Sequence, residues 1–305
     1  MTATPVLALG WLPTSDAVVI ASVCAVIGVP MLPAPPRSAR VAAVGTILRE
    51  LALTLGLYAL WGVIGHLATT EATGAYDRGQ RIWDLERTLH LPSEAVLQRH
   101  LLPYETLIRF LNSYYAFVHA TSVIVFLVWL FFRHRDHYPF WRNSLAFLTL
   151  MCLLIQTVAV APPRLIPSIG MVDTAAKYGP SVYPALGRGG PDQFSAMPSV
   201  HIAWAALFTF GVIAASTSRW RWSMLGHLGA TFAAVTMTAN HYWLDGLVAM
   251  ALLVPAFGFA LGVAAIVRRV GRNRIPPSPS DFDPGSNDGS LRRDAHDGVG
   301  AGVHA

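Results

Sequence analysis

The chain has 305 residues, of which 53% are hydrophobic and only 13% are charged, and its mean hydropathy is +0.46. Soluble domains carry about a quarter charged residues, so this composition argues against a soluble protein and for a membrane protein. The net charge is +5, but the arginines stand in short clusters between apolar runs, which is typical of membrane topology and argues against a nucleic-acid partner.

Apolar runs follow one another along the chain, and a spanning helix needs about 20 such residues. Six runs qualify or nearly so, at about 44–68, 110–132, 144–162, 200–216, 224–240 and 246–267. A seventh, 17–33, is shorter and contains Pro30, so whether it spans stays open. The expected fold is an all-α, polytopic membrane helical bundle with six core transmembrane helices and an extra N-terminal helix.

Three regions are expected. Residues 1–43 form an N-terminal segment with the extra helix, and residues 44–270 form the membrane domain. Residues 271–305 are rich in Pro, Gly, Ser and Asp, so they are predicted to be a disordered cytoplasmic tail without a packed core.

Arginines are unevenly shared between the two sides of this bundle. One side has short connections that carry Arg37, Arg40, Arg133, Arg135, Arg142, Arg219, Arg221, Arg268, Arg269, Arg272 and Arg274. The other side has two long connections, about 69–109 and 163–199, that carry few or charge-balanced cations. The positive-inside rule therefore places the arginine-rich side in the cytoplasm of a multi-pass cell-membrane protein. The amphipathic segment Tyr76–Leu102 is predicted to lie along the outer surface as one or two interfacial helices.

Four polar side chains stand at helix ends on the predicted outer side: Arg164, His201, His241 and Asp245. His241 and Asp245 are four apart, so on a helix they share one face and the carboxylate holds one imidazole nitrogen. His201 follows Ser199 in the first turn of a helix, where backbone N–H groups favour an anion. Arg164 offers a planar fork suited to two phosphate oxygens.

These groups suit phosphoryl transfer, which needs an oxyanion cradle, a nucleophile and an acid for the leaving oxygen. His241 is assigned as the nucleophile that forms a phosphohistidine, Asp245 orients it, and His201 protonates the leaving group. Arg164 and Ser199 are candidate phosphate ligands. Asn112, Tyr115 and His119 are candidates for the substrate pocket, although an interfacial aromatic belt would use the same residues.

The segments APPRL, MPSVH and NHYWLD carry these residues. The last two resemble motifs of the type-2 phosphatidic acid phosphatase superfamily, whose second motif usually reads PSGH and whose third ends in His-x-x-x-Asp. All three, with LERTLHLPSEAVLQ at about 80–97, resemble its inositolphosphorylceramide synthase-like (inositolphosphotransferase) branch. The resemblance covers about 45–265. It implies a six-helix membrane bundle, a His-His-Asp centre at His201, His241 and Asp245, a first-motif arginine at Arg164, and no metal or other cofactor.

The sequence departs from the broader superfamily at three motif positions. Thr157 replaces a lysine, Val235 replaces an arginine, and Val200 replaces the glycine of PSGH. Because two cations are missing, the pattern favours the synthase-like branch over the common lipid phosphatases.

Several functions stay open. A phospholipid or polyprenyl phosphate could lose its phosphate group to water, which makes a phosphatase, or to an alcohol such as inositol, which makes a transferase. Two histidines and an aspartate could also bind zinc or iron, although Arg164 would repel a cation. A transporter or scaffold is the third alternative, but the polar groups gather near one interface rather than at the midplane.

Overall fold

The structure is a computed structural model that describes residues 14–28, 39–68, 73–179 and 191–272. Within these ranges the regular structure is helical, apart from one isolated parallel β-bridge between Val160 and Ser195. The chain forms two compact units, Met1–Gly262 and Val263–Ala305, and the fold described below is that of the first. The predicted tail lies outside the described residues from position 273 onward.

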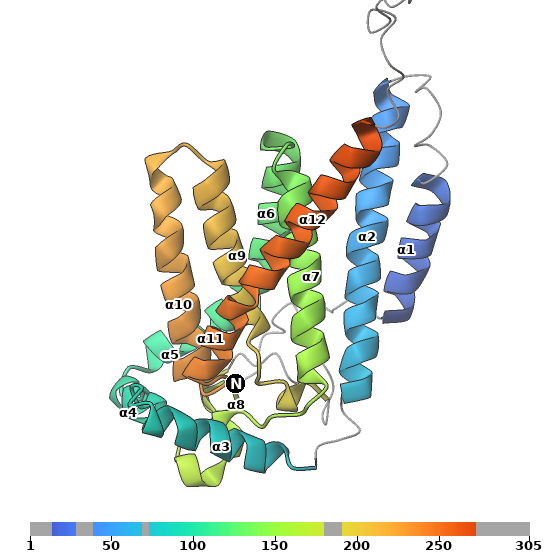
Figure 1. The fold of residues 1–305 in the computed structure, drawn as a ribbon. Coiled ribbons are helices and arrows are strands. Elements are labelled where there is room, and N and C mark those ends of the chain that lie inside the picture. The colour runs from blue at the N-terminus through green and yellow to red at the C-terminus, as the bar shows by residue number, and fades with distance from the viewer. Residues whose placement is uncertain (1–13, 29–38, 69–72, 180–190, 273–305) are drawn as a thin grey trace, which may run out of the picture. The chain divides into compact units, whose positions relative to one another are not determined.

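Long helices occupy the predicted apolar runs (Figure 1). They are α1 (Thr14–Gly28), α2 (Ala39–Ala68), α5 (Glu105–Ser113), α6 (His119–Arg133), α7 (Tyr138–Gln156), α9 (Val200–Ala215), α10 (Met224–Met237), α11 (Trp243–Ala251) and α12 (Leu253–Arg272). A π-helical turn, η2 (Tyr114–Val118), joins α5 to α6. The prediction of an all-helical protein is therefore confirmed.

Some of these helices are long enough to cross a membrane. Three described stretches are long and apolar enough to cross a bilayer: Ala43–Leu60, Tyr138–Gln156 and Trp243–Val270. The pair Glu105–Val118 and Thr121–Arg133, bent by 46°, makes a fourth if it is one broken span. Helices α1 and α9 are apolar but shorter. A membrane protein is thus supported, while the number of six core spans stays a prediction.

Helix α9 forms the centre of the core. Most of its side chains are buried, with Ile202, Ala203, Ala206 and Leu207 fully inaccessible. A helix that is hydrophobic on every face belongs inside a bundle, and α9 contacts α6, α7, α10 and α11. The many alanines let these neighbours approach closely, while larger side chains such as Phe208 fill the spaces between them.

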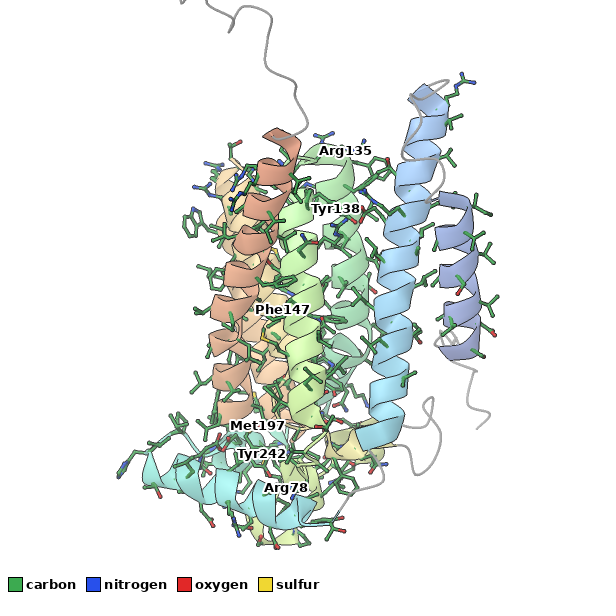
Figure 2. The ribbon with its side chains drawn as sticks, turned by 45° about the vertical axis from the view of Figure 1, so that its right-hand side comes forward. Arg78, Arg135, Tyr138, Phe147, Met197 and Tyr242 are labelled. Carbon is green, nitrogen blue, oxygen red and sulfur yellow. The ribbon has the colours of Figure 1, made fainter. Side chains whose placement is uncertain are left out.

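The two ends of the bundle differ (Figure 2). Arg135 and Tyr138 lie at one end, here called the Arg135 end, and Arg78, Met197 and Tyr242 lie at the opposite end, here called the Tyr242 end. The α6–α7 and α9–α10 connections, which carry clustered arginines, are both at the Arg135 end. This arrangement matches the predicted sorting of the loops.

Short helices cross the Tyr242 end (Figure 1): α3 (Ala75–Thr88), α4 (Glu94–Leu101) and α8 (Thr174–Tyr178). Helices α3 and α4 occupy the segment Tyr76–Leu102, where one or two amphipathic helices were predicted, and their interfacial position stays a prediction. Gly79 lets α3 come close to the bundle, because a Cβ there would lie 2.5 Å from the carbonyl oxygen of Ala161 and 2.8 Å from Oη of Tyr242.

Two helices end earlier than their apolar runs. Helix α7 covers Tyr138–Gln156 instead of 144–162, and α10 ends at Met237 instead of 240. Several of the remaining apolar residues are buried in the protein, since Ala159, Val160 and Ala161 pack in a second cluster with Ala75 and Tyr242. These residues are apolar because they belong to a protein core beneath α3. The length of the apolar run therefore overestimated the length of the helix.

Candidate active site

His241 lies in the connection between α10 and α11, one residue before the N-cap Tyr242. The expectation that His241 and Asp245 share a helix face is therefore wrong, although the pair does form. Asp245 is the third residue of α11, and its Oδ2 reaches back to within 3.2 Å of Nδ1 of His241. The same oxygen accepts the Tyr242 backbone N–H at 2.9 Å. The contact is thus a helix-capping interaction that also holds an imidazole.

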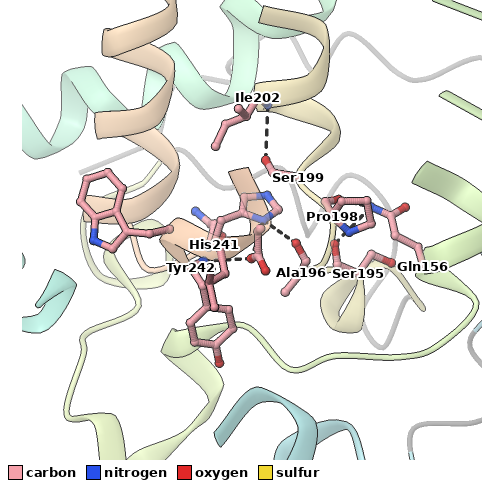
Figure 3. A network of polar contacts seen from close by, with 12 residues as sticks. Gln156, Ser195, Ala196, Pro198, Ser199, Ile202, His241 and Tyr242 are labelled. Atoms are coloured by element: carbon pink, nitrogen blue, oxygen red, sulfur yellow. Dashed lines mark hydrogen bonds and ion pairs between the residues drawn. The ribbon is translucent and has the colours of Figure 1, made fainter. Parts of the chain in front are cut away.

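The surroundings of His241 fix its tautomer. Its Nδ1 lies 2.7 Å from the carbonyl oxygen of Ala196, as Figure 3 shows. A carbonyl oxygen and a carboxylate can only accept, so Nδ1 carries the hydrogen, and in the neutral ring Nε2 keeps its lone pair. The side chain is only 5% exposed. The ring is therefore oriented and largely shielded from water.

His201 is the second residue of α9, which begins after the N-cap Ser199. Its ring centroid lies 5.7 Å from that of His241 and 4.3 Å from that of Tyr115, on which it stacks. The backbone N–H of Ser199 donates to the Asp245 carbonyl oxygen at 3.2 Å. This bond ties the start of α9 to the start of α11, so the two histidines are positioned together.

Ser199 has a structural role in this arrangement. Its side chain is fully buried and its Oγ accepts the Ile202 backbone N–H at 3.4 Å (Figure 3). Gln156, at the end of α7, holds the preceding segment by donating to the Pro198 and Ser195 carbonyl oxygens at 2.9 and 3.3 Å. Sequence reasoning missed Gln156, since a single polar residue at the end of an apolar run gives no specific signal.

Arg164 belongs to a 3-10 turn, Pro163–Leu165, and packs on the loop that carries His241. Its Nη1 donates to Oδ1 of Asn240 at 2.7 Å, and its backbone N–H donates to the Ala239 carbonyl oxygen. Its Nε lies 3.6 Å from Oδ2 of Asp173, and the side chain is 3% exposed. The structure thus brings the predicted arginine beside the residue that precedes His241.

The three pocket candidates have different surroundings. Tyr115 contacts His201, as described. Asn112 is buried, and its side chain donates to the carbonyl oxygens of Thr174 and Gly179 and accepts the Thr174 hydroxyl, which fixes α8. The side chain of His119 lies outside the part of the chain that the structure describes.

Two hollows lie where η2 and α6 face α9 and α10. A small one is lined by Tyr114, Tyr115, His201, His227, Thr231, Ala234 and Val235. A larger apolar groove of 470 Å³ begins at His227 and is lined mainly by side chains such as Val125, Trp129, Phe208 and Val212. His227 borders both hollows, and its Nδ1 lies 2.6 Å from Oη of Tyr114. The polar hollow beside His201 is therefore adjacent to an apolar one.

Two buried glutamates next to the site were missed. Glu86 and Glu94 read as surface charges of an amphipathic segment, yet both are fully buried. Burial, followed by the hydrogen bond to Glu94 and the charge of Glu94, raises the pKa of Glu86 to about 9. Glu86 comes four residues after Ile82, which puts it on the apolar face of α3, and that placement was the available signal.

The departures from the family motifs fall in different environments. Thr157 is exposed and its hydroxyl donates to the Leu154 carbonyl oxygen. Val235 is buried beside the hollow at His201. Neither position brings a cation to the site. Among the residues that the structure describes, no three His, Cys, Asp or Glu side chains are grouped as metal ligands.

Comparison with known proteins agrees with the motifs. No curated protein and no solved structure matches the chain. The sequence profile of the PAP2 superfamily matches residues 80–259, which include most of α3, all of α4, both histidines, Arg164 and Asp245. Members of this superfamily are generally phosphatases and phosphotransferases, and the membership implies lipid-phosphate substrates in a membrane setting. The chain belongs to the PAP2 superfamily, the type-2 phosphatidic acid phosphatases that its motifs resemble.

Proposed function

We propose that the chain is an integral-membrane lipid phosphotransferase or phosphatase that works through a phosphohistidine at His241. The observation that carries this proposal is the pairing at the Tyr242 end. His241 has its Nδ1 against two acceptors, and the His201 ring lies 5.7 Å away. An oriented imidazole with a free Nε2, beside a second imidazole, provides a nucleophile and an acid.

The first step transfers the phosphoryl group from lipid to protein. Nε2 of His241 attacks the phosphorus atom, and the bond between phosphorus and the lipid oxygen breaks. Protonated His201 gives its proton to that leaving oxygen, so the lipid departs as a neutral alcohol or diacylglycerol-type product. Asp245 stabilises the positive charge that develops on the His241 ring.

The second step frees the enzyme. Now neutral, His201 takes a proton from the attacking hydroxyl. The oxygen of that hydroxyl forms the new bond to phosphorus while the bond between phosphorus and Nε2 of His241 breaks. Water as the attacking group gives inorganic phosphate, and an alcohol such as inositol gives its phosphate monoester. A phosphodiester forms when the phosphoryl group taken from the lipid still carries a headgroup ester, since the lipid itself has left in the first step. The same side chains serve both outcomes, so acceptor binding decides between them.

The phosphate oxygens need donors during both steps. The first-turn N–H groups of α9, whose start is fixed by Ser199, are in place for an anion next to His201. Arg164 supplies positive charge from the loop that carries His241. Because Thr157 and Val235 bring no cation, we assign the inositolphosphotransferase-like branch in preference to a plain phosphatidic acid or prenyl phosphate phosphatase.

The apolar groove supports a lipid as the substrate. On α9 its lining residues Phe208 and Val212 lie about 10 and 16 Å along the helix axis from His201, at 1.5 Å per residue. Its 470 Å³ falls within the range of about 300–1,000 Å³ typical of ligand pockets. A hydrocarbon chain that lies there would leave its phosphate beside the histidines. The arginine-bearing loops at the opposite end favour a site that faces out of the cytoplasm.

The decisive experiment supplies purified protein with labelled lipid phosphates, with and without inositol. Phosphate release indicates a phosphatase, and a labelled phosphate ester of inositol indicates a transferase. His241→Ala should lower either rate by about 10³-fold or more, as expected for a nucleophile. The exposed His100 at the same end is the matched control, and His100→Ala should leave the rate unchanged. Turnover by His241→Ala at the wild-type rate would contradict the proposal.

The groove has its own test. Val125 lines the groove, whereas its equally exposed neighbour Ile124 does not. Val125→Trp should lower kcat/KM for long-chain lipid phosphates and leave a short-chain, water-soluble phosphate unaffected. Ile124→Trp should change neither, and equal losses in both variants would rule out the groove as the chain site.

A further inference from the structure

Three consecutive backbone N–H groups at the start of α11 each donate to a different carboxylate. The N–H of Tyr242 donates to Asp245 at 2.9 Å, that of Trp243 to Oε1 of Glu94 at 3.3 Å, and that of Leu244 to Oε1 of Glu86 at 2.7 Å. A helix leaves its first N–H groups without intrahelical partners. In α11, two of them are satisfied from other helices, since Glu86 lies in the last turn of α3 and Glu94 begins α4.

Further contacts fasten the same turn. Nε1 of Trp243 donates to the Pro92 carbonyl oxygen at 2.8 Å, in the connection between α3 and α4. Gln98 on α4 donates to the Met237 carbonyl oxygen at 3.0 Å, where α10 ends. Both ends of the loop that carries His241 are thus held by α3 and α4.

The glutamates have too few positive partners for both to be ionised. Nη2 of Arg87 lies 3.0 Å from Oε2 of Glu94 and 3.7 Å from Oε2 of Glu86, so one guanidinium serves both. Among the described residues, Oε2 of Glu86 has no hydrogen-bond donor. A proton on that oxygen would let it donate to Glu94 and remove one of two buried negative charges. Burial and the Glu94 charge raise the pKa of Glu86 accordingly.

We propose that Glu86 and Glu94 are positioning residues, a carboxyl pair that shares one proton and fixes the first turn of α11, and through it Asp245 and His241. This inference rests on the proposed function for its kinetic readout. The pair touches neither the lipid nor the reacting phosphate. It acts by holding the backbone from which Asp245 reaches Nδ1 of His241.

Neutral and shortened replacements test the pair. In Glu86→Gln the amide oxygen still accepts the Leu244 N–H and the amide NH₂ donates to Glu94, so kcat should stay within about 3-fold of wild type. In Glu86→Ala the Leu244 N–H loses its acceptor, and kcat should fall about 10- to 100-fold with KM little changed, the effect of misplacing a catalytic group. The kcat of Glu86→Asp should fall similarly, because its side chain is one methylene shorter and its carboxyl cannot reach the Leu244 N–H.

Controls separate positioning from general destabilisation. Asp84 is an exposed residue of the same helix, and Asp84→Ala should keep full activity. If Glu86→Ala does not fold, the comparison of Glu86→Gln with Glu86→Asp still decides. The pH profile adds a second readout: the ratio of wild-type kcat to Glu86→Gln kcat should fall at alkaline pH as the shared proton is lost, since ionisations common to both proteins cancel in that ratio. Wild-type kcat in Glu86→Ala and Glu86→Asp, or equal losses in Glu86→Gln and Glu86→Asp, would overturn the proposal.

One measurement does not depend on turnover. The ring N–H of His241 can be followed by NMR in protein with labelled histidine. Its Nδ1–H signal, hydrogen-bonded to Ala196 and Asp245, should persist in Glu86→Gln and be shifted or lost in Glu86→Asp. If the wild type hydrolyses no lipid phosphate but this pattern holds, the proposed function fails and the positioning role stands. An unchanged signal in Glu86→Asp counts against the positioning role.

Discussion

Buried carboxylates occur at both ends of the bundle, and their partners differ. At the Arg135 end, Glu50 of α2 accepts from Nη1 of Arg142 at 2.5 and 2.6 Å, from Arg49 at 2.8 Å and from the Tyr138 hydroxyl at 3.1 Å. At the Tyr242 end, Glu86, Glu94 and Asp245 are fully buried, and Arg87 lies close to the two glutamates.

The difference lies in how completely the negative charge is matched. Both oxygens of Glu50 have donors, and two cations surround it, so the cluster works as an ion pair that fastens α2 to α7. At the other end, Oε2 of Glu86 and Oδ1 of Asp245 have no hydrogen-bond donor among the described residues. An excess of buried negative charge is costly for folding, and it is usually retained where a proton or a developing positive charge is used. We infer from the comparison that incomplete compensation, more than burial alone, distinguishes the proposed functional cluster from a structural one.

The largest effect should come from a change among the carboxylates at the Tyr242 end, whose negative charge is not fully matched. Asp245→Asn keeps the size of the side chain but removes the negative charge and can favour the wrong imidazole tautomer, so kcat should fall about 10²- to 10⁴-fold. Glu50→Gln, the matched change at the Arg135 end, should leave kcat per folded molecule unchanged. Phosphate release normalised to folded protein measures both. A similar loss of kcat in the two variants would erase the distinction between the clusters.

In the Glu50 cluster at the Arg135 end, a substitution should change stability strongly and leave kcat per folded molecule unchanged. Arg142→Ala leaves Glu50 buried without its main partner, which should lower the free energy of unfolding by about 3–5 kcal/mol. Replacing both partners, as in Glu50→Leu with Arg142→Leu, should recover much of that loss, because well-packed apolar residues can substitute for a buried ion pair. Thermal unfolding in detergent measures both variants. A double variant no more stable than Arg142→Ala would show that the cluster needs its charges.

The smallest expected effect is on the pH dependence of stability. Because the pKa of Glu86 is raised from an ordinary value of 4.5 to about 9, the folded protein binds this proton more tightly than the unfolded chain does. Its contribution to stability is complete below pH 4.5 and is lost as the pH rises toward 9. Glu86→Gln should therefore lose less stability than wild type across that range, as measured by the melting temperature. Asp84→Asn on the same helix should follow the wild type, and parallel curves for all three proteins would contradict the raised pKa.

Much of the scaffold could be predicted from the sequence. The apolar runs, the scarcity of charged residues and the arginine clusters indicated a helical membrane protein whose polar candidates lie at one end. These signals are local, since hydrophobic periodicity and composition act on each segment separately. The two amphipathic helices α3 and α4 were found for the same reason.

The site could be predicted only through its motifs. His201, His241 and Asp245 were identified, but the assumed helix containing both His241 and Asp245 does not exist. A loop and a capping turn hold them instead, because α10 stops at Met237 and Ala239, in the connection that follows, packs in the cluster beneath α3. Helix ends depend on long-range contacts, which apolar runs do not report.

The sequence by itself determined which helices this protein builds and which polar side chains stand at their ends, because those features follow from local hydrophobicity and charge. Only the tertiary structure decided how these side chains are partnered. Glu86 and Glu94 come more than 140 residues before the backbone N–H groups that they accept, and Ala196 faces a histidine 45 residues later. Such contacts arise from packing between distant segments, so the environment of each charge was settled by the fold.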